Sequence, residues 1–451
     1  MVRFRAVRTR FGVILAKADS RSTWTIEMHW LTFVFLCALA LHLAARFWLS
    51  GRQIAFVMAH RNAVPSAFAG VVPLAEHARA ASYTAAKQRL ALFDSVLGAA
   101  LLLWLTLGGG IDAVGQWVAR SGVTGWLKET LHVLGVFAVL GAAGLPLSAY
   151  RTFGLEQHFG FNRTTVRTFV LDILKAWTLA VLLGGPVVAL VLWIMDSAGR
   201  RWWLVAWAAW SGVSLLLMVA WPRFIAPLFN RFSPLEDASL RGRIEALLAR
   251  CGFSAERVFV IDGSRRSSHG NAYFTGLGRE KRVVFFDTLL STLSPGQIES
   301  VLAHELAHFK LRHIPQRLCA NLLVSLLGFA LLGWLAAQTW FQAALGVTSP
   351  SNATLLVLFM MVSPVFTWVA APIVAGWSRR HEFEADAFAA KHSNASDLAD
   401  ALVRLYRDNA STLTPDPIYS VFHDSHPPPA ERIARLRSAF IDGDRAPVSA
   451  R

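Results

Sequence analysis

The sequence is short of charged residues and of cysteine. Asp, Glu, Lys and Arg make up only 16% of the 451 residues, whereas they make up about a quarter of a soluble domain, so the composition argues against an ordinary cytosolic enzyme. The three cysteines, Cys37, Cys251 and Cys319, lie far apart, and their spacing indicates neither a disulfide framework nor a cysteine metal site. The chain also lacks repeats and low-complexity tracts, and its apolar composition excludes a disordered or collagen-like protein.

The hydrophobic residues, 54% of the chain, are concentrated in long runs. A helix needs roughly 20 apolar residues to cross about 30 Å of hydrocarbon, and seven runs approach that length. These runs are residues 30–49, 90–107, 131–147, 170–195, 202–221, 318–341 and 355–377. Many of them end in tryptophan, as at Trp30, Trp221 and Trp377, where an interfacial belt is expected. We therefore predict a mainly α-helical, polytopic membrane protein with seven transmembrane helices.

Polar stretches divide the chain further, and the first of them mixes helix and strand patterns. Residues 234–250 favour a helix, 258–261 and 282–287 favour strands, 271–274 favour a third strand, and a new helix is expected to begin after Ser294. This mixture is typical of an α+β domain. The predicted parts are a basic N-terminal tail (1–29), transmembrane helices one to five with their loops (30–221), a catalytic part (222–317), transmembrane helices six and seven (318–377), and a C-terminal catalytic part (378–451).

The net charge of +15 is interpreted as a signal of orientation. The loop 342–352 carries no charge, whereas the other ends of the same two helices are basic, at Lys310, Arg312, Arg379 and Arg380. Because cytoplasmic loops are enriched in Lys and Arg, we expect both polar parts in the cytoplasm, which puts the basic tail on the opposite face. Membrane lipids are expected partners and nucleic acid is not, since other basic residues are interspersed with acidic ones and no binding module is present.

The sequence H-E-L-A-H at positions 304–308 carries the clearest chemical signal. His304 and His308 are four residues apart, so their imidazoles project from one helical face and can bind one metal ion. Glu305 lies beside that face, where it can take a proton from a metal-bound water. The pattern predicts a metal-dependent hydrolase, with a chance match on an exposed helix as the alternative.

A third protein ligand is expected downstream. Leu311 and Ile314 stand where a metzincin has Gly and His, so that class of metalloprotease is excluded. The segment S-R-R-H-E-F-E-A-D offers Glu382 and, one turn later on the same face, Asp386. We expect Glu382 to complete a site of two His and one Glu. Asp386 is expected to accept a hydrogen bond from a ligand histidine, which fixes the tautomer of that histidine.

The same segment contains two further candidates. Glu384 is the second choice as metal ligand, and His381 is interpreted as a surface histidine at the start of a helix. Two apolar runs separate His308 from Glu382, and two crossings return a chain to the membrane face that it left. The ligands can therefore meet at one membrane surface.

These motifs resemble those of the type-I CAAX prenyl endopeptidases, integral-membrane zinc proteases of the gluzincin type that trim prenylated proteins. The likeness covers most of the chain from about residue 159 onward. The other matching stretches are G-F-N at 160–162, I-A-P-L-F-N-R-F-S-P-L at 225–235, D-G-S-R-R-S-S-H-G-N-A-Y-F-T-G at 262–276, K-R-V-V-F-F-D-T-L-L at 281–290, and S-H-P-P-P-A-E-R-I-A-R-L at 425–436.

The resemblance implies a fold and residue roles. The family's seven helices enclose a hollow chamber, with a zincin-like domain at its cytoplasmic end. One Zn²⁺ per chain would be held by His304, His308 and Glu382, with Glu305 as the base that activates a zinc-bound water. The resemblance also implies two further roles. An edge strand that pairs with the substrate would be formed by Asn271, Ala272, Tyr273 and Phe274. The donors that stabilise the oxyanion would be His426 and Arg432.

The expected activity is hydrolysis of peptide bonds in a peptide or protein, lipidated or not. Short loops and the strong cytoplasmic bias are typical of a bacterial protein, so we expect the inner (plasma) membrane, with the catalytic site on the cytoplasmic side. Two alternatives stay open. One is a quality-control zinc protease that needs no prenyl group. The other is a transporter with a structural zinc site, because Asp94, Asp172 and Lys175 lie in or beside the apolar runs.

Overall fold

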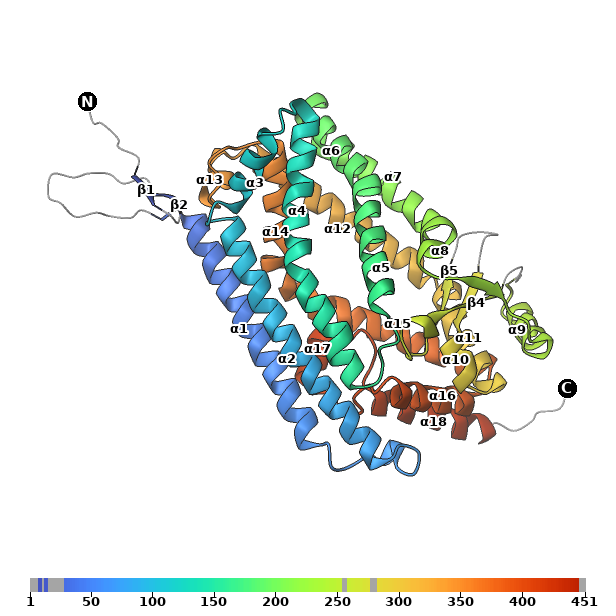
Figure 1. Ribbon diagram of the computed structural model, residues 1–451. Coiled ribbons are helices and arrows are strands. Elements are labelled where there is room, and N and C mark those ends of the chain that lie inside the picture. Colours follow the sequence, from blue (N-terminus) through green and yellow to red (C-terminus); the bar gives the residue numbers. More distant parts are fainter. Residues whose placement is uncertain (1–6, 10–11, 15–27, 254–257, 276–281, 446–451) are drawn as a thin grey trace, which may run out of the picture.

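Seven helical stretches form the body of the molecule. The structure, a computed structural model, describes residues 7–9, 12–14, 28–253, 258–275 and 282–445, so the predicted basic tail lies mostly outside the described residues. Among these described residues, the stretches long and apolar enough to cross a membrane are Trp30–Ala59, Leu74–Leu105, Gly125–Glu156, Val166–Ser197, Gly199–Phe229, His313–Ala336 and Asn352–His392. All seven predicted spans are confirmed. In Figure 1 they lie beside a smaller group of strands and short helices.

Several helices extend well beyond the predicted runs. Helix α2 (Leu74–Leu105) begins 16 positions before residue 90, the predicted start. The prediction began too late because the first half of the helix carries polar side chains such as Lys87 and Gln88, which lower its hydropathy. Helix α15 (Ala371–His392) continues the seventh span, and its last turns carry Glu382 and Asp386. These extensions carry membrane helices into the catalytic part of the molecule.

The other membrane helices contain local irregularities. The spanning segments are α1 (Trp30–Ala59), α4 (Gly125–Ala149) with η2 (Tyr150–Glu156), α5 (Val166–Leu179), η3 (Ala180–Gly184) with α6 (Gly185–Ser197), α7 (Trp202–Ala220) with η5 (Trp221–Ile225), α12 (His313–Ala336) and α14 (Asn352–Thr367). The segments η2, η3 and η5 are π-helical turns, a form that bends a helix and recurs at functional sites. Pro146 and Pro364 lie inside helices, where they remove a backbone donor.

A four-stranded sheet stands at the catalytic end. Its order is β3 (Phe232–Pro234), β4 (Val258–Ile261), β6 (Arg282–Phe286) and β5 (Ala272–Thr275). Strand β6 runs parallel to β4 and antiparallel to β5, with Tyr273 opposite Val284. A separate hairpin pairs β1 (Val7–Thr9) with β2 (Gly12–Ile14). The three predicted strands of the catalytic part are present, and β5 lies at an edge of its sheet.

Short helices complete the catalytic part and the loops. They are η1 (Ser66–Phe68), α3 (Gly110–Ala119), η4 (Gly199–Arg201), α8 (Ala226–Phe229), α9 (Ala238–Arg250), η6 (Gly263–Arg265), α10 (Asp287–Thr292), α11 (Pro295–Lys310), α13 (Thr339–Ala344), η7 (Trp368–Ala370), α16 (Ala395–Asp408), α17 (Pro417–His423) and α18 (Pro429–Arg445). Side chains from the sheet, α9, α11 and α18 share one apolar core, in which Ile244, Phe285, Leu306 and Ile433 are fully buried. This core fixes α11 against the sheet.

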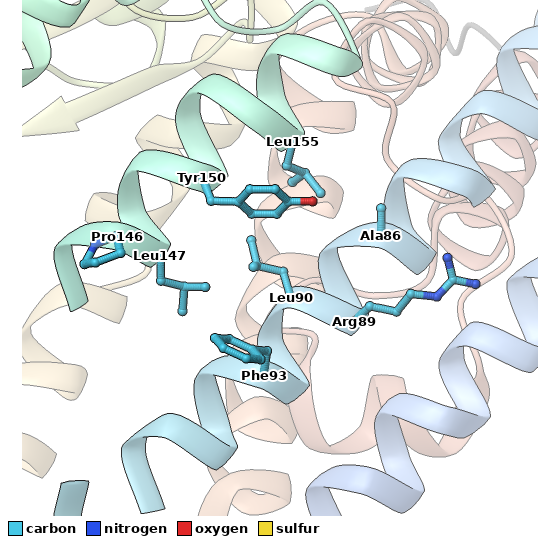
Figure 2. Close-up of a pocket in the computed structure, with 8 residues that line it drawn as sticks. All are labelled: Ala86, Arg89, Leu90, Phe93, Pro146, Leu147, Tyr150 and Leu155. Carbon is cyan, nitrogen blue, oxygen red and sulfur yellow. The ribbon is translucent and has the colours of Figure 1, made fainter. Parts of the chain in front are cut away.

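An apolar pocket opens between two membrane helices. Ala86, Leu90 and Phe93 of α2 face Leu147 of α4 and Tyr150 of η2 across a space of about 510 Å³ (Figure 2). None of its lining residues belongs to the predicted zinc site. Whether the helices also enclose one large chamber stays a prediction.

Candidate metal centre and active site

Helix α11 presents the H-E-x-x-H motif, and its start is set locally. Ser294 accepts a hydrogen bond from the backbone N–H of Gln297, and the Gln297 side chain accepts one from the backbone N–H of Ser294. This capping box satisfies donors that a helix start leaves open, and Pro295 suits the first helical position. The helix ends after Lys310, and Arg312 has a positive φ of 59° before α12 begins. The motif therefore lies on a short, well-defined helix.

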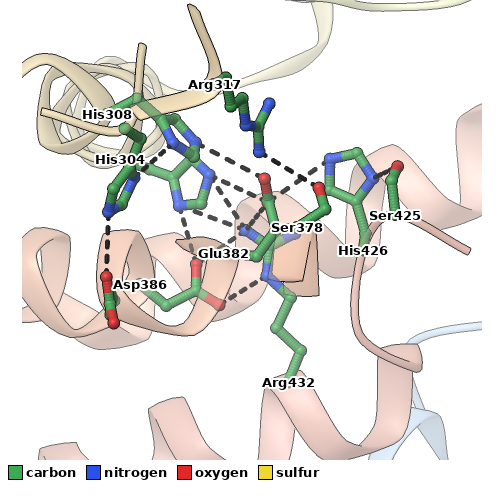
Figure 3. A network of polar contacts seen from close by, with 11 residues as sticks. His304, His308, Arg317, Ser378, Glu382, Asp386, Ser425, His426 and Arg432 are labelled. Atoms are coloured by element: carbon green, nitrogen blue, oxygen red, sulfur yellow. Dashed lines mark hydrogen bonds and ion pairs between the residues drawn. The ribbon is translucent and has the colours of Figure 1, made fainter. Parts of the chain in front are cut away.

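The three predicted metal ligands come together. Ligand atoms of His304, His308 and Glu382 all lie within 4.8 Å of one another. Nε2 of His304 is 3.4 Å from Oε2 of Glu382, and Nε2 of His308 is 3.6 Å from Oε1. Figure 3 shows both imidazoles directed at this carboxylate. Two imidazoles and one carboxylate form the protein ligand set of many catalytic zinc sites.

The electrostatics of the cluster suit a cation. Oε2 of Glu382 is buried and has no hydrogen-bond partner among the described residues, although buried polar atoms normally have one. Burial alone would lower the pKa of His304, but the neighbouring carboxylates of Asp386 and Glu382 outweigh it and raise this pKa to about 9, so positive charge is stabilised there. Burial, and then the neighbouring His304, lower the pKa of His308 to about 3, which keeps its imidazole neutral. These residues therefore fit a metal ion.

A second layer of polar groups holds His304. Nδ1 of His304 lies 2.9 Å from Oδ1 of Asp386. Arg432, only 5% exposed, binds the same carboxylate through Nε at 2.6 Å and Nη2 at 2.7 Å. This bidentate pair compensates the buried charges of both partners. Arg432 is also within 3.7 Å of Glu382, so it lies at the metal site, although its shortest hydrogen bonds there go to Asp386.

His308 has a different partner, which the sequence did not indicate. Its Nδ1 lies 3.0 Å from Nδ1 of His313, whose Nε2 lies 3.0 Å from Oε2 of Glu384. Glu384 is in turn bound by Arg380 at 2.9 Å. The ring of His381 stacks on that of His313, with centroids 4.0 Å apart. The interpretation of His381 as a surface residue is wrong, because α15 begins ten residues earlier and His381 is 2% exposed.

Glu305 shares a small cavity with the metal ligands. A space of about 250 Å³ is lined by Glu305, His304, His308, Glu382 and His426, together with residues of α12. Burial raises the pKa of Glu305 and outweighs the opposing positive charge of His304, and the negative charge of Glu382 adds to the rise. A carboxylate of this kind, facing a cavity beside the metal ligands, is suited to exchange a proton with a reacting group.

The loop that carries His426 is tied to two membrane helices. Nε2 of His426 lies 3.4 Å from Oε2 of Glu382, while its side chain is 62% exposed. The preceding helix α17 is capped by Asp416, and Arg52 of α1 binds this carboxylate through two nitrogens at 3.2 and 2.8 Å. Arg379 of α15 donates to the carbonyl oxygens of Ser420 and Asp424 at 3.0 and 2.8 Å. These bonds fix His426 beside the metal cluster.

The predicted substrate strand lies next to α11 and outside the cavity. Ala272, Tyr273 and Phe274 belong to β5, and Asn271 precedes it and accepts a backbone hydrogen bond from Phe286 at 3.0 Å. The structure thus groups the metal ligands, Glu305, Asp386, His426 and Arg432 in one cluster, with the four strand residues on a neighbouring element.

The seven candidate membrane helices, together with the His–His–Glu cluster, define the class of protein: an integral-membrane metalloendopeptidase. Comparison with known proteins supports this class. Residues 53–231 match the family model described as CAAX prenyl protease N-terminal, five membrane helices, and residues 234–439 match that of peptidase family M48. The chain therefore belongs to peptidase family M48.

Individual relatives agree. The chain is 38% identical over 315 residues to the CAAX prenyl protease 1 homolog of Arabidopsis thaliana, covering 68% of this chain and 74% of that protein. It is 38% identical over 329 residues to CAAX prenyl protease 1 of Saccharomyces cerevisiae, covering 69% and 72%. The crystal structure of Ste24p from S. mikatae matches with a TM-score of 0.84 at 31% identity, covering 90% and 98% of the two chains. These matches favour neither the quality-control protease nor the transporter.

Proposed function

We propose that this membrane metalloendopeptidase holds one zinc ion per chain with His304, His308 and Glu382 and cleaves peptides that bind along β5. The observation that carries the proposal is the convergence of the three ligand atoms within 4.8 Å around a buried carboxylate oxygen without a hydrogen-bond partner among the described residues. When bound, zinc would supply a Lewis acid that polarises the scissile carbonyl and makes water more acidic. The other steps fall to the residues around it.

In this proposal Glu305 moves the proton. From its position in the 250 Å³ cavity it takes a proton from the attacking water and then passes it to the leaving amine. The exposed His426 donates a hydrogen bond to the oxyanion. Arg432 contributes its positive charge to the oxyanion and orients His304 through Asp386, because Nε and Nη2 of its guanidinium both bond to that carboxylate.

The edge strand supplies a place for the substrate backbone. Strand β5 pairs with β6 on one side, and an edge strand offers N–H and C=O groups to an extended peptide. Such binding selects an extended conformation more than a particular sequence. Prenylated CAAX proteins, the substrates that the names of the relatives point to, are the substrates that we propose for this strand.

We propose the cytoplasmic side of a bacterial plasma membrane as the location of the site. The basic residues Lys310, Arg312, Arg379 and Arg380 lie at the end of α12 and α15 that carries the metal cluster. The uncharged 342–352 loop joins the opposite ends of the two spans (Figure 1). Lys and Arg are enriched on the cytoplasmic side.

Removal of the metal tests the proposed activity. The purified protein in detergent should cleave an internally quenched peptide, lose this activity in a zinc chelator, and recover it when zinc is restored. The reason is that the polar residues of the cavity lack a Lewis acid of their own. Turnover that continues in the chelator, with zinc measured as absent, would rule out the metal-dependent mechanism.

A lipid group on the substrate is proposed to bind in the pocket between α2 and α4. Its lining, which is apolar apart from Arg89 and the hydroxyl of Tyr150, and its volume of about 510 Å³ suit a hydrocarbon chain. The variant Ala86→Trp would fill part of the pocket and should raise KM for a prenylated peptide about tenfold, while KM for the same peptide without the lipid stays unchanged. Ala142→Trp, at an exposed position of α4, is the matched control. Equal effects on both peptides would contradict the lipid assignment.

A further inference from the structure

The two histidine ligands are supported in different ways. His304 bonds directly to a carboxylate, Asp386, which Arg432 binds in turn. His308 instead meets another imidazole, that of His313, and only beyond it a carboxylate, Glu384. His313 is 1% exposed, whereas the Glu384 side chain is 40% exposed and pairs with Arg380. The chain Arg380–Glu384–His313–His308 thus leads from the surface to the metal cluster.

The hydrogen-bond geometry allows one consistent assignment of protons. Nε2 of His308 faces Glu382 at 3.6 Å, so it is the nitrogen that would bind metal, and a metal-binding nitrogen carries no proton. The neutral ring then has its proton on Nδ1 and donates it to Nδ1 of His313. His313 must therefore carry its own proton on Nε2, where it donates to Oε2 of Glu384. Each of the two contacts at 3.0 Å then has one donor and one acceptor.

A second metal ion is the competing explanation for this cluster. Ligand atoms of His313, His381 and Glu384 also lie within 4.8 Å of one another, and Nδ1 of His381 is buried without a hydrogen-bond partner among the described residues. The rings of His313 and His381, however, are stacked with an angle of 2° between their planes. Lone pairs lie in the ring planes, so those of two parallel rings do not converge on one ion. His313 also uses both of its nitrogens in hydrogen bonds.

We infer that His313 is a positioning residue that fixes the tautomer and orientation of His308, and that Glu384 acts on the metal site through His313. This inference rests on the proposed zinc site. Partners of this kind orient a ligand imidazole and raise its basicity, and their loss typically weakens metal binding by about 10–100-fold. The stacked rings of His381 and His313 hold the relay in place from one side.

A double-mutant cycle on purified protein tests the relay. Metal affinity is measured by competition with a zinc chelator for His313→Phe, Glu384→Ala and the double variant. His313→Phe keeps a ring that can stack on His381 and should weaken zinc binding about 10–100-fold. Glu384→Ala should weaken it less, and the double variant should equal His313→Phe, because Glu384 has no route to the metal without His313. His313→Gln, whose amide has both a donor and an acceptor, should restore part of the affinity.

Controls separate the relay from folding and from the proposed function. His392→Phe, at the end of the same helix α15, should leave zinc affinity unchanged, and thermal unfolding monitors the fold of every variant. Glu384 is partly exposed, so Glu384→Ala tests the relay even if His313→Phe fails to fold. Wild-type affinity in both single variants, additive losses in the double variant, or a second zinc ion that Glu384→Ala removes would each overturn the relay. Absence of zinc from the wild-type protein would instead overturn the proposed zinc site.

Discussion

Glu305→Gln is expected to reduce kcat for peptide cleavage by about 10²–10⁴-fold while leaving zinc content and fold unchanged. The amide has nearly the shape of the carboxylate, so the packing of α11 against the sheet is preserved. It cannot accept the proton of the attacking water, and the other carboxylate in the cavity, Glu382, is directed at the two histidines. The loss should appear in kcat, since Glu305 acts on the reacting water and lies outside β5.

Single-turnover cleavage and zinc content, measured on the same preparation, check this result. Glu245→Gln, an exposed position of α9, is the matched control and should behave as wild type. Cleavage by Glu305→Gln within a factor of about three of wild type would mean that another group serves as base. A parallel loss of zinc would show that the substitution disturbs the metal cluster, and the role of Glu305 as base would then be unsupported.

The parts of the site that the sequence predicted depend on local rules. The capping box at Ser294 and the four-residue spacing of His304 and His308 both act within one helix, α11, and helical periodicity fixes which side chains share a face. Glu382 is distant in sequence, but two membrane crossings between it and His308 constrain the topology strongly. The seven spans were predictable for a similar reason, since hydropathy over about 20 residues is a property of each segment alone.

The parts that were missed depend on how helices cross. His313 begins α12 after the left-handed residue Arg312, and this change of direction, which spacing within α11 does not reveal, brings it to His308. Glu384 was only the second choice as metal ligand, because it does not share the helical face of Glu382 and Asp386, and it is this other face that meets His313. The first half of α2 was not predicted as part of a membrane helix, because its polar side chains lower the mean hydropathy of that segment. It extends a membrane helix among polar partners, as where Gln88 donates to Tyr419 at 2.7 Å.

His304→Ala and Glu382→Ala are each expected to remove most of the bound zinc. Structural zinc sites bind with about 10–16 kcal/mol, shared among four ligands, so one protein ligand accounts for roughly 3 kcal/mol, or at least about 100-fold in affinity. Glu382→Ala should have the larger effect, because its carboxylate faces both histidines. In His304→Ala the buried pair of Asp386 and Arg432 remains intact, and Glu382 keeps its contacts with His308 and His426.

Zinc content by elemental analysis and affinity by chelator competition measure these losses, with His392→Ala and Glu245→Ala as matched controls. The fold should survive in both variants, because the core of Ile244, Phe285, Leu306 and Ile433 includes none of the three ligands, and thermal unfolding would show this. Peptide cleavage should fall together with zinc and return at high zinc concentration, since a weakened site can still be filled by mass action. Full zinc content in both variants at limiting zinc would exclude this cluster as the metal site, whatever the activity of the protein.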